Sequence, residues 1–230
     1  MANAFTRGVS YSGAELQKEN LPDTVAYLKT LPDYVNVKAA LSFQKDLSME
    51  ELAALQMENQ NDLPILWVAV RNANYHANIE TSVEPTDSNT DVTGATVQTN
   101  DSFPAQLLPQ IGFEPNGTGI YFEQINNHYP DFELSPHLSD TDSKKNGALY
   151  ESHFQTLLQV MADHPDFLKT MESYESNLSA YYAAVQRFIK ANGIKTYGVT
   201  VLGSPSEILQ FCELAGVEGI FVEELTFSRD

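Results

Sequence analysis

Every second residue from Val35 to Phe43 is apolar, which is the period of a β-strand with one buried face. The next segment, DLSMEELAALQMEN, predicts a helix, because Ser48 can cap its first turn and Glu51 can return a hydrogen bond to the cap. LPILWVAVRNA, which begins at Leu63, is a nearly continuous apolar run and indicates a strand that is covered on one face or on both. The predicted order is strand, helix, strand.

The C-terminal region repeats this order. TYGVTVLG predicts a strand, and VEGIFVEELTF predicts another at the end of the chain. Between them, SPSEILQFCELAG predicts a helix in which Ser204 is the cap and Pro205 takes the first helical position. Glu207 completes the capping box, and Gly216 ends the helix. Both ends of the chain are therefore built on the same pattern.

The repeated pattern predicts one α+β fold. Two successive βαβ units with short helices indicate a ferredoxin-like split βαβ sheet of four strands, with both helices on one face. The chain then divides into a lead-in with a short helix at 1–34 and a single domain at 35–230, which consists of a βαβ half at 35–72, an acidic loop and helical insertion at 73–195 and a βαβ half at 196–227.

The insertion is too long to be a simple connection. Its first part, about 76–119, is rich in Thr, Asn, Asp, Ser, Pro and Gly and predicts long loops with a short hairpin. The apolar residues of FPAQLLPQIGFEPNGTGIYFEQI, at 103–125, indicate a segment that docks on the core. From about 145 to 192 the apolar spacing is helical, with a break at Asp163–His164–Pro165.

Aromatic residues have two interpretations. Trp67 has apolar neighbours and is expected in the core. Tyr174, Leu178 and Tyr181 share one side of the predicted second helix, because steps of three and four residues nearly complete a turn. We expect this row to pack against the sheet, and the alternative is a platform for a sugar.

The stretch TYGVTVLGSPSEILQF also has the outline of a phosphate-binding turn, with a strand, a glycine, a hydroxyl residue and a helix. A phosphate site needs more glycine and usually a lysine near the turn. Here Gly203 is the only glycine of the turn, and no Lys or Arg occurs between Lys195 and Arg229. A capped helix is therefore the preferred interpretation, with an anion site as the alternative.

Charge argues against some partners. The chain has 230 residues, of which 42% are hydrophobic, and 31 acidic against 13 basic residues give a formal net charge of −18. Such a charge repels nucleic acids and anionic lipid surfaces. From Asn72 to Ser143 there are 11 acidic residues and no Lys or Arg. The insertion is thus expected to be a solvated loop face, and the alternative is a docking surface for a cationic partner or a metal.

Cys212 is the only cysteine, which excludes an intramolecular disulfide and a Cys-based zinc site. Its spacing places it on the apolar side of a helix, as buried filler. Low cysteine content suits the cytosol or the exterior of a Gram-positive cell. There is no run of 18 apolar residues and no signal-peptide core, so the chain itself is expected to be soluble.

The sequence carries no recognisable motif for reactive chemistry. DTDSKKNGALYE places Asp140, Asp142 and Glu151 at ligand positions of a calcium loop, but Lys145 stands where glycine is needed, so a polar lead-in to a helix is preferred. His128 and His137 are the one pair considered for a metal, and their spacing does not support it. Motifs for a nucleophile elbow, a P-loop or a dinucleotide fold are missing from the sequence. We therefore assign no catalytic, cofactor-binding or metal residue and expect no cofactor.

Two blocks of the sequence resemble a known family. VNVKAALSFQKDLSMEELAAL…LPILWVAVRNA and LSAYYAAVQRFIKANGIKTYGVTVLGSPSEILQFCELAGVEGIFVEEL are similar to the C-terminal domain of the sigma factor regulators of Gram-positive bacteria, and so is QIGF between them. The likeness covers about 35–72 and 145–227 and leaves the acidic insertion largely unmatched. These regulators are membrane-anchored proteins of the anti-sigma type, whose C-terminal domain lies outside the membrane.

The resemblance implies a sensing or partner-binding domain without catalysis, at the cell membrane and facing outside the cell. Its partner would be an unknown extracytoplasmic ligand or protein, and a sigma factor would be reached only through a cytoplasmic part that this chain lacks. Two alternatives remain open at this point. One is an extracellular cell-wall polysaccharide hydrolase or binding module that uses carboxylates of 72–143, and the other is a metal-dependent adhesion or scaffold module.

Overall fold

A computed structural model describes residues 21–59, 63–72, 111–115, 128–129, 131–134, 138–139, 141–171 and 178–227. A helix at 21–28 precedes the elements that follow. These elements are β1 (Val35–Ser48), α3 (Met49–Glu58), β2 (Ile65–Val70), β3 (Gly112–Phe113), α5 (Ser143–Asp163), α6 (Pro165–Met171), α7 (Leu178–Asn192), β4 (Lys195–Gly203), α8 (Pro205–Ala215) and β5 (Val217–Phe227).

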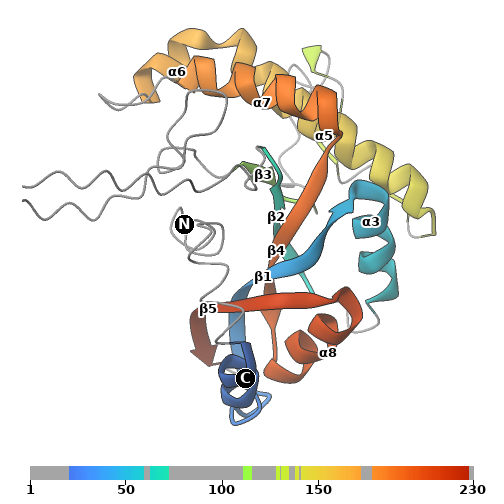
Figure 1. Ribbon diagram of the computed structural model, residues 1–230, viewed down its shortest axis with the longest axis vertical. Coiled ribbons are helices and arrows are strands. Elements are labelled where there is room, and N and C mark those ends of the chain that lie inside the picture. The colour runs from blue at the N-terminus through green and yellow to red at the C-terminus, as the bar shows by residue number, and fades with distance from the viewer. Residues whose placement is uncertain are drawn as a thin grey trace, which may run out of the picture.

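The strands form one antiparallel sheet in the order β3-β2-β4-β1-β5 (Figure 1). β4 lies between the two strands of the N-terminal half, and β1 lies between the two strands of the C-terminal half. In the register of β1 and β4, Leu41 is opposite Val199 and Val37 is opposite Gly203. The two halves therefore interleave in a single sheet, and the predicted α+β class is confirmed. The ferredoxin-like description stays an interpretation of this order.

Within the part of the chain that the structure describes, the sheet has five strands where the sequence predicted four. The additional strand is β3, which lies inside QIGF of the insertion and pairs with β2 at the edge of the sheet. A two-residue strand is too short to produce a period in the sequence, and this is why the pattern missed it. The sequence predicts loops over 76–119, and of this segment only 111–115 lies within the described residues.

Both predicted capping boxes are present. The Glu51 amide donates to the Ser48 hydroxyl over 3.1 Å, and the Ser48 amide donates to the Glu51 carboxylate over 2.7 Å. In α8, the Ser204 amide donates to the Glu207 carboxylate over 2.7 Å, and the helix ends at Gly216 with a φ of 62°. The serine at each strand–helix junction therefore serves the helix itself.

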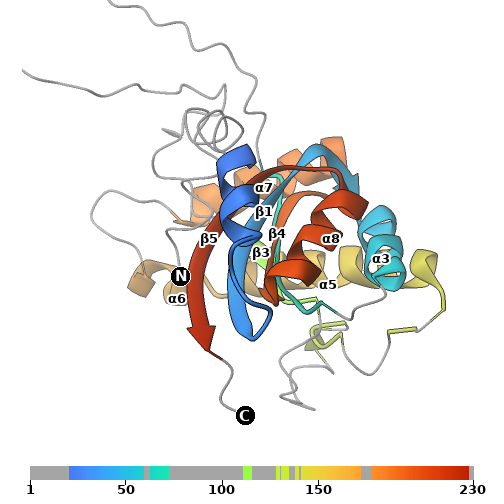
Figure 2. The same cartoon turned by 90° about the horizontal axis from the view of Figure 1, so that it is seen from below.

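One face of the sheet carries the main core. α3 and α8 lie together on this face, where their apolar residues pack with Val37 and Leu41 of β1 and with Val199 of β4 (Figures 1 and 2). Leu28, at the end of the N-terminal helix, is also buried in this cluster. Cys212 is partly buried beside it, and burial raises the pKa of its thiol to about 12, as expected for a packing residue.

The opposite face carries a smaller cluster of Ala40, Ala69 and Tyr197, with Trp67 and Phe221 packed beside it. Next to this cluster, Arg71 forms a two-bond ion pair with Asp46, at 2.8 and 2.6 Å. The guanidinium also stands 4.6 Å from the centre of the Tyr197 ring. A planar guanidinium suits both contacts at once, so Arg71 ties the ends of β1 and β2 to β4.

The helices of the insertion form a layer next to the β2–β3 side of the sheet (Figure 1). α5 crosses α3 at Gly147, where an added Cβ would lie 2.6 Å from the Cα of Glu50. Nearby, the Tyr150 hydroxyl donates to Gln56 of α3 over 2.6 Å. The break at 163–165 is confirmed, but a separate helix, α6, stands between it and α7.

Candidate ligand pocket

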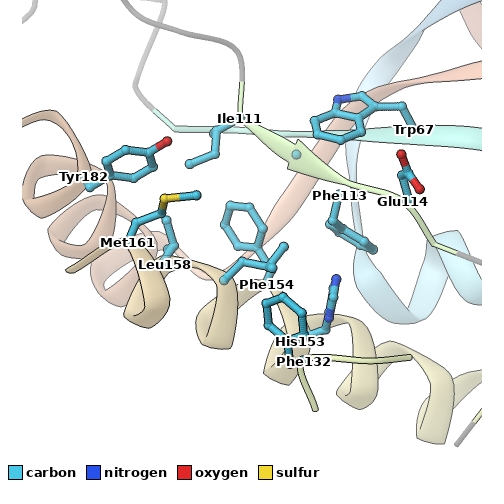
Figure 3. A pocket seen from close by; sticks show the side chains of 12 residues that line it. Trp67, Ile111, Phe113, Glu114, Phe132, His153, Phe154, Leu158, Met161 and Tyr182 are labelled. Atoms are coloured by element: carbon cyan, nitrogen blue, oxygen red, sulfur yellow. The ribbon is translucent and has the colours of Figure 1, made fainter. Parts of the chain in front are cut away.

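A pocket of about 350 Å³ lies between the edge of the sheet and the helical layer (Figure 3). β3 runs along it, between Trp67 of β2 on one side and residues of α5 and α7 on the other (Figure 3). The lining residues are mostly apolar or aromatic: Trp67, Ile111, Gly112, Phe113, Glu114, Phe132, His153, Phe154, Leu157, Leu158, Met161 and Tyr182. Pockets of this character and size are typical of small-molecule sites, at the lower end of their volume range.

β3 is held in place by its pairing with β2. Phe113 is opposite Val68, Gly112 is opposite Ala69, and the Val70 amide donates to the Ile111 carbonyl over 2.9 Å. The pairing presents Phe113 to the core side, where it is buried, and leaves the carboxylate of Glu114 exposed at the pocket. The Phe113 ring also contacts the rings of Tyr150, His153 and Phe154, so α5 packs against this short strand.

Trp67 forms the wall on the other side of β3 (Figure 3). Its indole lies against Gly112, where an added Cβ would be 2.6 Å from the indole Nε1. The sequence predicted Trp67 in the core, but the residue is only partly buried and packs on the smaller cluster while it lines the pocket. Leu66 and Val68, the apolar neighbours of Trp67, gave no indication of the pocket, because adjacent residues of a strand point to opposite faces.

His153 is held rigidly by a loop segment. Its Nδ1 lies 2.9 Å from the Asp131 carbonyl oxygen, and the Ser152 hydroxyl donates to the Asp131 carboxylate over 2.5 Å. The imidazole also meets the Phe113 ring edge-on, with centroids 5.6 Å apart. Burial lowers the pKa of His153, so the ring is neutral at neutral pH. Nδ1 then carries the proton and donates it to the carbonyl.

The α7 wall is anchored to the sheet by a buried hydrogen bond. The amide nitrogen of Asn72, just after β2, donates to the Tyr181 hydroxyl over 2.7 Å. Tyr182, the next residue, faces the pocket opposite Met161 of α5 (Figure 3). Tyr181 is buried, as expected for the predicted aromatic row, and Tyr174 of that row lies outside the described residues.

The other candidates do not come together as sites. Asp142 is the N-cap of α5, because its carboxylate accepts from the Lys145 amide over 2.9 Å, and this confirms the polar lead-in at the proposed calcium loop. Asp140 and His137 lie outside the described residues, and His128 packs edge-on against the Tyr129 ring. Among the described residues, no group of three or more His, Cys, Asp or Glu side chains could hold a metal ion.

The strand–helix turn at Ser204 is not arranged for an anion. The Ser204 hydroxyl is bonded to Glu207, whose carboxylate already occupies the start of α8. A Cβ on Gly203 would also lie 2.9 Å from that carboxylate, so this glycine serves close packing. A second negative group at the turn would be repelled by the carboxylate.

Comparison with known protein families gives a match over most of the chain. A family model described as "Sigma factor regulator C-terminal" matches residues 28–224 in one interval, which includes the region between the two blocks of the resemblance. No curated protein and no solved structure matches the chain. None of the helices in the described ranges has the length and hydropathy of a membrane span. The family match covers most of the chain, so the chain belongs to the sigma factor regulator C-terminal family and has a role in sigma-factor regulation.

Proposed function

We propose that this chain is the extracytoplasmic sensing domain of a membrane-anchored, anti-sigma-type regulator in a Gram-positive bacterium, and that it acts by binding and not by catalysis. The family match supports the regulatory role. The observation that carries the sensing role is the pocket at β3, because it is bounded by both the sheet and the insertion helices.

The arrangement of the pocket gives a ligand a direct mechanical effect. Trp67 belongs to β2, which pairs with β4 in the centre of the sheet, while Phe154 and Tyr182 belong to α5 and α7. A ligand that contacts residues of both the sheet and the helices favours one position of the helical layer relative to the sheet. Binding shifts a conformational equilibrium only by the difference in affinity for its two states, and a pocket between two layers supplies such a difference.

In this proposal the change passes through the membrane anchor to a cytoplasmic part that binds the sigma factor. The partners are then a ligand or protein outside the cell and a sigma factor inside it. The net charge of −18 is consistent with this, since it disfavours direct contact with nucleic acid.

Protease treatment of intact cells tests the location. The complete gene product is tagged at its cytoplasmic end and expressed in its own host, and protease is added outside. We expect the tagged protein to shorten by the mass of this domain, while a cytoplasmic control protein stays intact. Protection of the full-length product in intact cells, with cleavage only after lysis, would contradict the proposal.

Deletion of the domain tests the regulatory part. A chromosomal deletion of residues 28–224 from the complete gene is compared with the parent strain by measurement of sigma-dependent transcripts. We expect the deletion to fix the sigma factor in one activity state, so that the transcripts no longer respond to the conditions that change them in the parent strain. An unchanged response in the deletion strain would rule out a sensing role for the domain.

A further inference from the structure

We propose that the pocket binds a small amphiphile with a single cationic amine group, whose apolar part lies among the aromatic side chains and whose ammonium lies near Glu114 and Trp67. This inference rests on the proposed function, since it names the class of ligand for the same pocket.

The lining favours a cation over an anion. Glu114 carries the only carboxylate among the twelve lining residues, and none of the twelve is a lysine or an arginine. His153 adds no positive charge, because burial keeps its ring neutral. An anionic head group would find no opposite charge in the lining and would meet the Glu114 carboxylate instead.

The aromatic content of the lining acts in the same direction. Six aromatic rings border the pocket: Trp67, Phe113, Phe132, His153, Phe154 and Tyr182. The faces of Trp, Tyr and Phe rings attract ammonium groups. Tryptophan gives the strongest attraction of this kind, and Trp67 stands at the same end of the pocket as Glu114 (Figure 3). One end of the pocket therefore combines an indole with a carboxylate.

The rest of the pocket suits a short hydrocarbon chain. Leu158 and Met161 of α5 lie between the Glu114 end and Tyr182 (Figure 3), and Leu157 of the same helix also lines the pocket. A volume of about 350 Å³ suits one small molecule. The overall charge of −18 also raises the concentration of cations near the surface.

Trp67 is the only tryptophan, so its fluorescence reports directly on the pocket. The full chain is titrated at neutral pH with octylammonium, octanol and octanoate, which share one hydrocarbon chain and differ in head-group charge. We expect all three to change the emission if they bind, with octylammonium bound most tightly and octanoate most weakly. Calorimetry on the same samples checks the order of affinities.

Two charge variants distinguish the effect of the Glu114 carboxylate in the pocket from the effect of the overall negative charge. Glu114→Gln is expected to weaken octylammonium binding about two- to fivefold, the range of an exposed ion pair, and to leave octanol unchanged. Glu213→Gln removes the same charge from an exposed position on α8 and is expected to change neither. Equal losses in both variants would overturn the role of Glu114.

A shape variant tests the apolar part. Leu157→Phe narrows the pocket and is expected to weaken octylammonium and octanol alike, while Leu214→Phe on the exposed side of α8 has no effect. Octanoate binding as tightly as octylammonium would overturn the cationic class. Absence of octylammonium binding in both fluorescence and calorimetry would overturn the inference. The proposed function would still be decided by the protease and deletion experiments.

Discussion

The indole of Trp67 lies directly against the backbone of Gly112, where an added Cβ would come 2.6 Å from the indole Nε1. One strand carries the indole and the neighbouring strand carries the glycine that accommodates it. Covering a glycine in an edge strand with a cross-strand aromatic ring also stabilises the strand pairing. The contact therefore shapes the pocket wall and helps to hold the edge strand β3 on β2.

Gly112→Ala is expected to displace the indole and to disturb the pairing of β3 with β2, because the added Cβ would clash with the Val68 carbonyl oxygen as well as with the indole. The free energy of unfolding should fall by about 1–3 kcal/mol, the usual cost of overpacking. The Trp67 emission maximum should shift because the ring loses its position. Gly147→Ala is the matched control, since it creates a similar clash at the α3–α5 crossing. It should destabilise the protein without shifting the native emission. An unchanged spectrum and denaturation midpoint in Gly112→Ala would show that this contact is absent.

Ser204→Ala is expected to destabilise the protein by about 1 kcal/mol, because it removes the hydroxyl that caps α8. Ser204→Thr keeps the hydroxyl and should recover most of the loss. Chemical denaturation measures both variants. Phosphate binding that is present in the parent and lost in Ser204→Ala, at unchanged stability, would instead support the anion-site alternative.

His153 is expected to make stability depend on pH. Burial lowers the pKa of the folded ring below its ordinary value of 6.5, so the unfolded chain binds a proton first as the pH falls. The stability from this group is complete above the ordinary pKa and is lost as the pH falls through the folded pKa. Between about pH 7 and pH 5, His153→Gln should therefore lose less stability than the parent. Identical slopes in both proteins would contradict a buried neutral ring.

Cys212 is expected to react with thiol reagents only on unfolding. Burial raises the pKa of its thiol to about 12, with a smaller contribution from Glu213. The native thiolate fraction near pH 8 is then about a thousandfold lower than in the unfolded chain, because the ordinary pKa is 9.0. Absorbance of the released thiol reagent, with and without denaturant, measures the ratio. Similar rates in both conditions would show that the side chain is accessible.

Local patterns predicted the elements whose sequence signal lies in neighbouring residues. The alternation in β1 and the S-x-x-E caps at Ser48 and Ser204 were readable because each depends on neighbours within a few residues. The pocket was not readable, because it depends on contacts between distant segments. The bond between Asn72 and Tyr181 joins residues 109 positions apart, and β3 is recognisable only through its pairing with β2. Residue spacing carries no information about such contacts.

The central claim is that the pocket between the sheet and the insertion helices carries the signal of a sigma-factor regulator. The most direct measurement is sigma-dependent transcription in the native host, with Leu157→Phe introduced into the complete gene and Leu214→Phe as the control. At equal protein levels, we predict that Leu157→Phe changes the transcript level at least about fivefold, the lower end of typical allosteric coupling, and that Leu214→Phe does not. The claim would be contradicted if the Leu157→Phe protein no longer binds octylammonium and the strain still gives parent-level transcription with an unchanged response.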